Sequence, residues 1–238
     1  APIIPVSAHH DVNLDVLIEA IEKTIPTPDR DSDDRAVMHI ARSFDVNRPG
    51  TRPTKLTGGV IGGSIVEGTF REGDEITIGP GRKIENGNKS YWEPIETTIT
   101  SMQGGGGKRN QMTAGGLCGF GTLLDPSVTT ADNLSGQVLA KKGELPEVRT
   151  ECAIEVHLMK NMVGGEGESE DKIHPLRNNE MLMVNVATST SVGIVKGVEK
   201  GKASLQLRLP ICADEGQRVS LSRRVGARWR LIGHGTIL

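Results

Sequence analysis

The densest positive charge lies near the carboxyl end of the chain. Between Leu221 and Leu238 there are four arginines and no carboxylate: Arg223, Arg224, Arg228 and Arg230. Guanidinium groups form strong hydrogen bonds with phosphate, so this segment is a candidate contact for a nucleic-acid backbone. If it is a strand, Arg228 and Arg230 share one face and Trp229 points the other way into a core. The alternatives are arginines paired with Asp or Glu across a sheet, or a contact with another subunit.

A second basic group lies in a glycine-rich segment, GGGGKRN at Gly104–Asn110. Glycines allow a ligand to approach the backbone closely, and Lys108 and Arg109 can neutralise phosphate. The spacing differs from the nucleotide phosphate loop, G-x-x-x-x-G-K-[ST], because Met102 stands in place of the first glycine and Arg109 in place of Ser or Thr. We therefore predict either a nucleic-acid contact or an ordinary surface turn, and no nucleotide phosphate site.

Other chemistry has little support in the sequence. The six histidines show no HExxH spacing, and the three cysteines (Cys118, Cys152 and Cys212) form no CxxC pair. Neither a metal site nor a disulfide framework is predicted. A net charge of −2 gives no overall field that would attract nucleic acid, so any anion site must be local. No apolar run reaches the roughly 18 residues of a membrane span and no signal peptide is visible, which predicts a soluble, cytoplasmic protein without membrane association.

The elements that must position these residues begin with an apolar run at residues 1–6 and a helix. Asn13 is a good N-cap, apolar residues follow at helical spacing from Leu14 to Ile25, and Pro26 ends the run. One strand and one helix cannot cover each other's apolar faces. Residues 1–28 are therefore interpreted as the end of an α/β domain whose earlier part would precede this chain. Residues 29–35 hold four aspartates and no apolar side chain, which predicts an exposed linker.

After this linker the apolar period changes to two, and turn signals such as RPG, REGD, GPG and NGN separate short segments. Many short strands at close spacing predict barrels or sandwiches. Gly143 and Pro146 interrupt the series, so we expect two β domains at residues 36–143 and 144–238, with loops at 104–111 and 164–172. The candidate strands are residues 37–42, 63–70, 75–78, 95–102, 117–124, 137–140, 152–159, 181–187, 192–198, 203–209, 218–221 and 229–232.

Several stretches are similar to the gamma subunits of archaeal and eukaryotic translation initiation factor 2, a family of GTPases related to elongation factor Tu. The resemblance runs from the first residue to the last, and GGGGKRN departs from it by being richer in glycine. RSFDVNRPG and the arginine-rich end are its most specific parts. The matching stretches are APIIPVSA (1–8), IPTPDRD (25–31), RSFDVNRPG (42–50), GGVIGGSIVEG (58–68), GGLCGFGTLLDP (115–126), ADNLSGQVL (131–139), NNEMLMVNV (178–186) and LSRRVGARWRLIGHG (221–235).

This resemblance implies a mainly β fold: two antiparallel β-barrels, like domains II and III of elongation factor Tu, behind the last strand and helix of an α/β GTPase domain. It implies that the intact protein binds GTP and Mg²⁺ and delivers initiator methionyl-tRNA to the small ribosomal subunit. The alpha subunit would dock on the second domain and the beta subunit on the GTPase domain. Because the phosphate loop is missing, we expect this chain alone to hold no cofactor and not to hydrolyse GTP.

Site residues follow from the same resemblance. Ser7 and Ala8 match the last guanine-recognition motif, in which backbone N–H groups meet the base. The segment with Lys108 and Arg109 would border the pocket for the aminoacylated 3′ end, and the terminal arginines would contact tRNA phosphates. For Arg42–Asn47 two interpretations stay open, a structural role at the barrel edge or a contact with tRNA or a partner. Gly58–Gly63 indicates close strand packing or bends. The alternatives are an elongation-type or selenocysteine-specific tRNA carrier, or a subunit scaffold without catalysis.

Overall fold

The computed structural model describes all residues except 1, 29–33, 88 and 163–171. The chain divides into two compact units, Ala1–Asp31 and Ser32–Leu238. Most of the loop expected at residues 164–172 and most of the linker expected at 29–35 lie outside the described residues. In the described part, no helix is long and apolar enough to cross a membrane.

The first unit contains the short 3-10 helix η1 (Ala8–His10) and the helix α1 (Leu14–Thr24). The helix is where the sequence predicts it, but Asn13 does not cap it: its φ is 58° and its side-chain amide donates to the carbonyl of Pro5 at 2.9 Å. Residues 2–6 are not a strand, because a strand needs a neighbour to pair with. In the described part of this unit, the isolated bridge between Ser7 and Val12 is the only such pairing. Ile18 exposes 61% of its surface, so the apolar stripe of α1 is uncovered in this unit.

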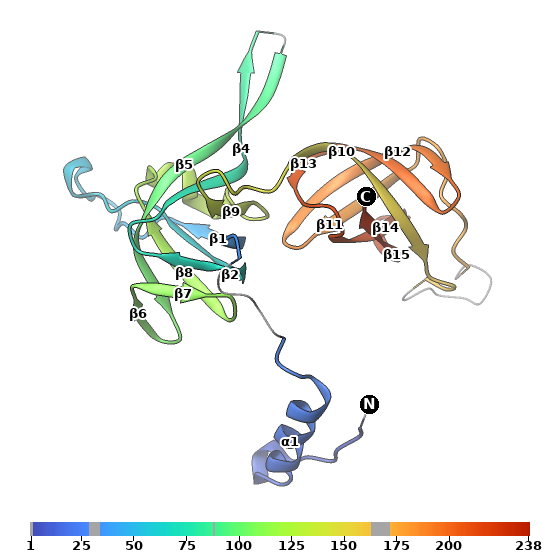
Figure 1. Ribbon diagram of the computed structural model, residues 1–238, viewed down its shortest axis with the longest axis horizontal. Coiled ribbons are helices and arrows are strands. Elements are labelled where there is room, and N and C mark those ends of the chain that lie inside the picture. Colours follow the sequence, from blue (N-terminus) through green and yellow to red (C-terminus); the bar gives the residue numbers. More distant parts are fainter. Residues whose placement is uncertain (1, 29–33, 88, 163–171) are drawn as a thin grey trace. The chain divides into compact units, whose positions relative to one another are not determined.

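The second unit contains two closed antiparallel barrels of six strands each, as the sequence predicts (Figure 1). The first barrel has the strand order β4-β9-β1-β2-β8-β5, closed by pairing of β5 with β4, and β6 extends it beyond β5. A separate two-stranded sheet joins β3 and β7. The bounds are β1 (Val37–Phe44), β2 (Val60–Glu67), β3 (Thr69–Arg71), β4 (Glu75–Asn86), β5 (Lys89–Gly104), β6 (Gly107–Arg109), β7 (Gln111–Thr113), β8 (Leu117–Thr122) and β9 (Val138–Lys141).

Side chains at alternate positions along the strands point inward and fill this barrel. In β2, for example, Ile61, Gly63 and Ile65 are buried while the residues between them are partly exposed. Phe70 and Phe120 are fully buried and meet edge to face with ring centroids 5.5 Å apart. Short helices η2 (Pro53–Lys55), α2 (Pro126–Thr129) and η3 (Thr130–Asp132) lie in the connections, and Asp125 caps α2 by accepting from the N–H of Ser127 at 2.9 Å.

Strands β4 and β5 continue past the barrel as a two-stranded ribbon (Figure 1). The GPG signal at residues 79–81, predicted as a turn, is an irregularity inside β4, where the register shifts between Ile78 and Arg82. Gly81 has a φ of 91°, and a Cβ there would lie 1.9 Å from the carbonyl oxygen of Glu93 on the facing strand. Glycine is thus required by close strand approach, and the turn described for this ribbon is at Gly87, within the NGN signal.

The second barrel closes in the order β10-β13-β12-β11-β14-β15. Its core holds sixteen buried side chains among the described residues, including Leu182, Leu205 and Ile232. Strand positions agree with those expected from the sequence, although most strands are longer. The bounds are β10 (Val148–Leu158), β11 (Met181–Val186), β12 (Ser189–Glu199), β13 (Lys202–Cys212), β14 (Arg218–Val225) and β15 (Arg228–Ile237).

Candidate functional site

The glycine-rich segment is a tight hairpin rather than the loop expected at residues 104–111. Gln103 pairs with Lys108 and Met102 with Arg109, and the two turn residues Gly105 and Gly106 have φ of 58° and 81°. Two consecutive positive φ values define the turn that suits hairpin twist and favours glycine. Lys108 and Arg109 are exposed, and neither forms an ion pair within the described residues. The hairpin therefore presents two uncompensated cations to solvent.

The four terminal arginines lie on the β14–β15 hairpin but differ in their surroundings. Arg223 forms an ion pair with Glu180, both side chains being 17% exposed, and it also donates to the carbonyl of His174 at 3.1 Å. Glu180 in turn accepts from the N–H of Arg177 at 3.0 Å. The charge of Arg223 is thus compensated, and this side chain holds the segment before β11 against β14, as the structural alternative for these arginines requires.

The other three arginines lie towards the tip of the hairpin. Arg224 is exposed and donates to the carbonyl of Gly226 at 3.3 Å, while Arg228 is exposed and Arg230 half-buried opposite Arg223. Trp229 is only half-buried and lies outside the barrel core, contrary to the expectation, because the register shifts after Leu221 and the hairpin extends beyond the core there. Arg224 and Arg228 are accordingly the best placed of the four for a phosphate contact.

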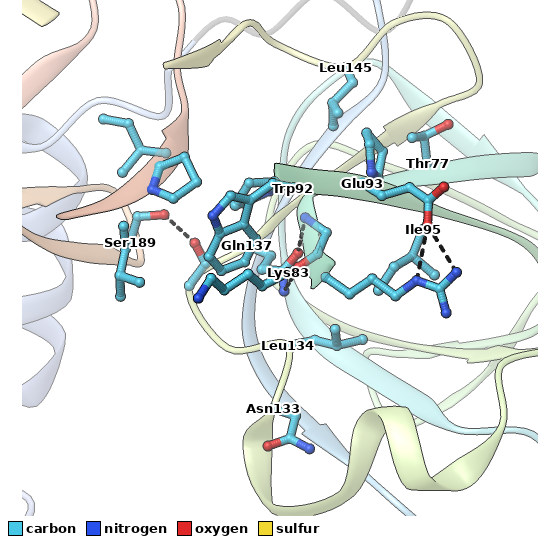
Figure 2. Close-up of a pocket in the computed structure, with 18 of the residues that line it drawn as sticks. Thr77, Lys83, Trp92, Glu93, Ile95, Asn133, Leu134, Gln137, Leu145 and Ser189 are labelled. Carbon is cyan, nitrogen blue, oxygen red and sulfur yellow. Dashed lines mark hydrogen bonds and ion pairs between the residues drawn. The ribbon is translucent and has the colours of Figure 1, made fainter. Parts of the chain in front are cut away.

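Sequence reasoning missed a cavity of about 1260 Å³ lined by both barrels (Figure 2). Its first-barrel wall includes Trp92 and the cross-strand pair of Arg82 and Glu93, whose ion pair is 2.9 Å long. Gln137 bonds both backbone groups of Gly81, accepting from its N–H at 2.8 Å and donating to its carbonyl at 3.2 Å. The walls mix apolar and charge-compensated groups, an arrangement suited to binding and not to acid–base chemistry. The sequence feature that could have indicated it is Trp92, which lies two residues before Pro94.

Two family models match the chain. Residues 150–237 match the model described as "Initiation factor eIF2 gamma, C terminal", and residues 58–140 match "Elongation factor Tu domain 2". Proteins named translation initiation factor 2 subunit gamma align with all of this chain: 52% identical over 237 residues in Methanothermobacter thermautotrophicus, 49% over 237 in Methanocaldococcus jannaschii and 51% over 237 in Thermococcus kodakarensis.

Along its whole length, this chain is similar to the gamma subunits of initiation factor 2. It spans 58%, 57% and 57% of the length of those three relatives. The elongation-type and selenocysteine-specific alternatives are not favoured, because the second barrel matches the gamma model and the relatives are gamma subunits. The names of these relatives place them in translation initiation.

Ser7 and Ala8, which are expected from the sequence to meet a guanine base, lie in the first unit. Ser7 exchanges backbone hydrogen bonds with Val12, donating its N–H at 3.2 Å and accepting at 3.1 Å. Ala8 begins η1, where a helical N–H has no partner within the helix. Of the two residues, Ala8 is thus better placed to offer a backbone N–H to a base. The described residues hold no cluster of His, Cys, Asp or Glu that could bind a metal ion.

The gamma-type motif RSFDVNRPG has a structural role in this barrel. Arg42 donates from Nε to Asp132 at 2.9 Å, and the same carboxylate accepts from the N–H of Ser43 at 2.9 Å. Asn47 exchanges two hydrogen bonds of 2.8 Å with the backbone of Thr57. These contacts fix two connections to the end of β1, which supports the structural interpretation of Arg42–Asn47.

The Arg42–Asp132 contact predicts a pH dependence. Hydrogen bonds from Arg42 and from the N–H of Ser43 lower the pKa of Asp132 below its usual 3.8. A carboxyl whose pKa is lower in the folded state stabilises the protein above its unfolded pKa and loses that effect as the pH falls through the folded value. The gap in urea midpoint between the wild type and Asp132→Asn should therefore be constant above about pH 5 and close below 3.8. Glu199→Gln, an exposed control, should show no comparable gap, and a gap that persists at low pH would exclude this contact as its source.

Proposed function

We propose that this chain supplies the two barrels with which an initiation factor 2 gamma subunit binds initiator methionyl-tRNA and the alpha subunit. The observation that carries the proposal is identity of about half the residues along the whole chain to proteins of that name. We propose residues 1–28 as the end of the GTPase domain, 29–35 as the linker, 36–143 as domain II and 144–238 as domain III.

In the intact cytoplasmic protein, GTP and Mg²⁺ would bind in the GTPase domain, which the beta subunit would also contact. Ser7 and Ala8 would meet the guanine edge there, and GTP would set the state in which tRNA is held. The barrels would respond to GTP hydrolysis in the GTPase domain and would not carry out the hydrolysis themselves. The complete subunit would then deliver its tRNA to the small ribosomal subunit.

The alpha-subunit assignment has a direct test, because the docking barrel is present in this chain. Calorimetric titration with the alpha subunit from the same source should give saturable one-to-one binding. The reason is that residues 36–143, the proposed docking domain, form a closed barrel with its own buried core. A flat titration with a chain that is folded by circular dichroism would contradict docking on these barrels.

If the basic residues of the two hairpins contact tRNA phosphates, replacing them should weaken the salt dependence of tRNA binding. We propose Lys108 and Arg109 on the first barrel, and Arg224, Arg228 and Arg230 on the second, as phosphate contacts, with Arg223 contributing mainly through its pair with Glu180. Each phosphate contact adds roughly 0.7–0.9 to the slope of log affinity against log salt. In the intact factor, replacing Lys108 and Arg109 with glutamine should lower that slope by roughly 1.4–1.8.

Lys196 and Lys202, two exposed lysines of the second barrel outside the proposed contacts, provide the matched double replacement. That variant should keep the wild-type slope. Replacing Arg228 and Arg230 tests the second barrel in the same way. A slope unchanged in either test variant would remove the corresponding hairpin from the tRNA contact.

A further inference from the structure

The place where the two barrels meet is held by few apolar contacts. Its buried cluster contains four side chains among the described residues, Val37, Val138, Ala140 and Cys212, compared with fifteen in the first barrel core and sixteen in the second. We call this cluster the seam. A small interface between domains normally allows relative motion. Additional contacts are therefore needed if the barrels are to keep one orientation.

Arg35 provides such contacts at the edge of the seam. Its guanidinium forms a two-pronged pair with Asp214 of the second barrel, with the Nη1–Oδ1 distance being 3.2 Å, and its Nε lies 3.4 Å from Glu67 of β2. The next residue, Ala36, donates its N–H to the side chain of Glu144 at 3.1 Å. One arginine thus joins β2, the β13–β14 connection and the start of β1.

We propose that Arg35 and Asp214 form a clamp that fixes the orientation of the second barrel relative to the first. The geometry differs from that of the other arginine pairs of the unit. Arg82 and Glu93 join neighbouring strands of one ribbon, which backbone hydrogen bonds already hold together. Arg35 and Asp214 are 179 residues apart, and among the described residues no strand pairing links the two barrels. A two-pronged guanidinium–carboxylate pair restricts orientation as well as distance. The clamp thereby keeps the cationic hairpins of the two barrels in a constant arrangement.

The three cysteines provide built-in reporters. Cys212 belongs to the seam, whereas Cys118 lies in the first barrel core and Cys152 in the second. All three are buried, and burial raises the pKa of Cys118 to about 11 and that of Cys212 to about 12. Thiolate is the reactive form, so labelling requires opening of the structure around each sulfur. The labelling rate of each cysteine, followed by mass spectrometry of its peptide, reports opening at that place alone.

We expect Arg35→Met and Asp214→Asn each to raise the labelling rate of Cys212 about tenfold, with Cys118 and Cys152 unchanged. The two variants change the local charge in opposite directions, so acceleration in both indicates opening and not a field effect on the thiol. The reciprocal swap, Arg35→Asp with Asp214→Arg, should restore slow labelling.

Arg82→Met serves as the matched control, because it breaks an arginine–carboxylate pair away from the seam and should leave all three rates unchanged. The clamp is overturned if Cys212 labels at the wild-type rate in both single variants. It is equally overturned if the three cysteines accelerate together, which indicates general destabilisation. These outcomes involve neither tRNA nor the alpha subunit, so they are independent of the proposed function.

Discussion

Replacing Phe120 with alanine should destabilise the first barrel by about 3–5 kcal/mol. Phe120 is fully buried on β8, and its ring meets that of Phe70 edge to face at 5.5 Å. Truncation removes the apolar contacts of one ring, leaves a cavity beside the other and removes the aromatic pair itself. With a urea dependence of about 2 kcal/mol per molar, the unfolding midpoint should fall by about 2 M.

The two tryptophans allow each barrel to be followed separately. Trp92 lies on β5 of the first barrel and Trp229 on β15 of the second. In a Trp229→Phe background, fluorescence therefore reports the first barrel, and in a Trp92→Phe background the second. The lower urea midpoint of Phe120→Ala should be seen with Trp92 as the probe. The control Tyr91→Ala, which removes a side chain that is 51% exposed, should leave the midpoint nearly unchanged. An equal fall for Tyr91→Ala would mean that burial of Phe120 is not the cause.

Replacing Gly63 with alanine should cost about 3 kcal/mol or more, although it adds a single methyl group. A Cβ at Gly63 would lie 2.0 Å from the carbonyl oxygen of His39 and 3.0 Å from the terminal carbon of Met38. Gly63 is on β2, which pairs with β1 on one side and with β8 on the other. The backbone cannot move away from His39 without weakening the hydrogen bonds of β2 to both β1 and β8, and this loss destabilises the fold.

The neighbouring glycine is the matched control. A Cβ at Gly62 would find its nearest atom at 3.8 Å, an ordinary contact. Gly62→Ala should therefore leave stability between unchanged and about 1 kcal/mol higher, since alanine restricts the unfolded chain more than glycine does. Urea unfolding followed through Trp92 separates the two variants. Similar midpoints for Gly62→Ala and Gly63→Ala would show that the close approach to His39 is not limiting.

Gly63 also illustrates how much of the fold the sequence could predict. Glycines at residues 58–63 indicated close strand packing or bends. Close strand packing is confirmed at Gly58, which faces Thr122 of β8, and at Gly63, which faces His39 of β1, whereas Gly59 lies against Thr129 of α2. The alternation of Ala203, Leu205 and Leu207 with polar residues located β13, because side-chain alternation is a local property of a strand. Leu209 continues the pattern in sequence but is 49% exposed and lines the cavity, since the barrel core ends at Leu207 and resumes at Ile211.

Features that depend on distant residues could not be predicted. The GPG signal at residues 79–81 indicates a turn in isolation, and only the carbonyl of Glu93 on the facing strand makes it an irregularity within β4. Clustered charge correctly marked the terminal arginines as a group. It could not separate Arg223, whose partner Glu180 lies 43 residues away, from its exposed neighbours. The cavity and the seam likewise arise from contacts between the barrels, which no local pattern encodes.

The β4–β5 ribbon has a consequence for the behaviour of the protein in concentrated solution. Within the described residues, β5 pairs with β8 only from Ile99 onwards, so the preceding part of β5 has one edge without a strand partner. Such an edge can recruit a strand from another molecule and begin aggregation. Charged side chains along the ribbon, among them Arg82, Lys83, Glu85 and Glu93, would have to be desolvated if a second ribbon were laid alongside. We therefore expect these charges to disfavour pairing of this bare strand edge with a second molecule.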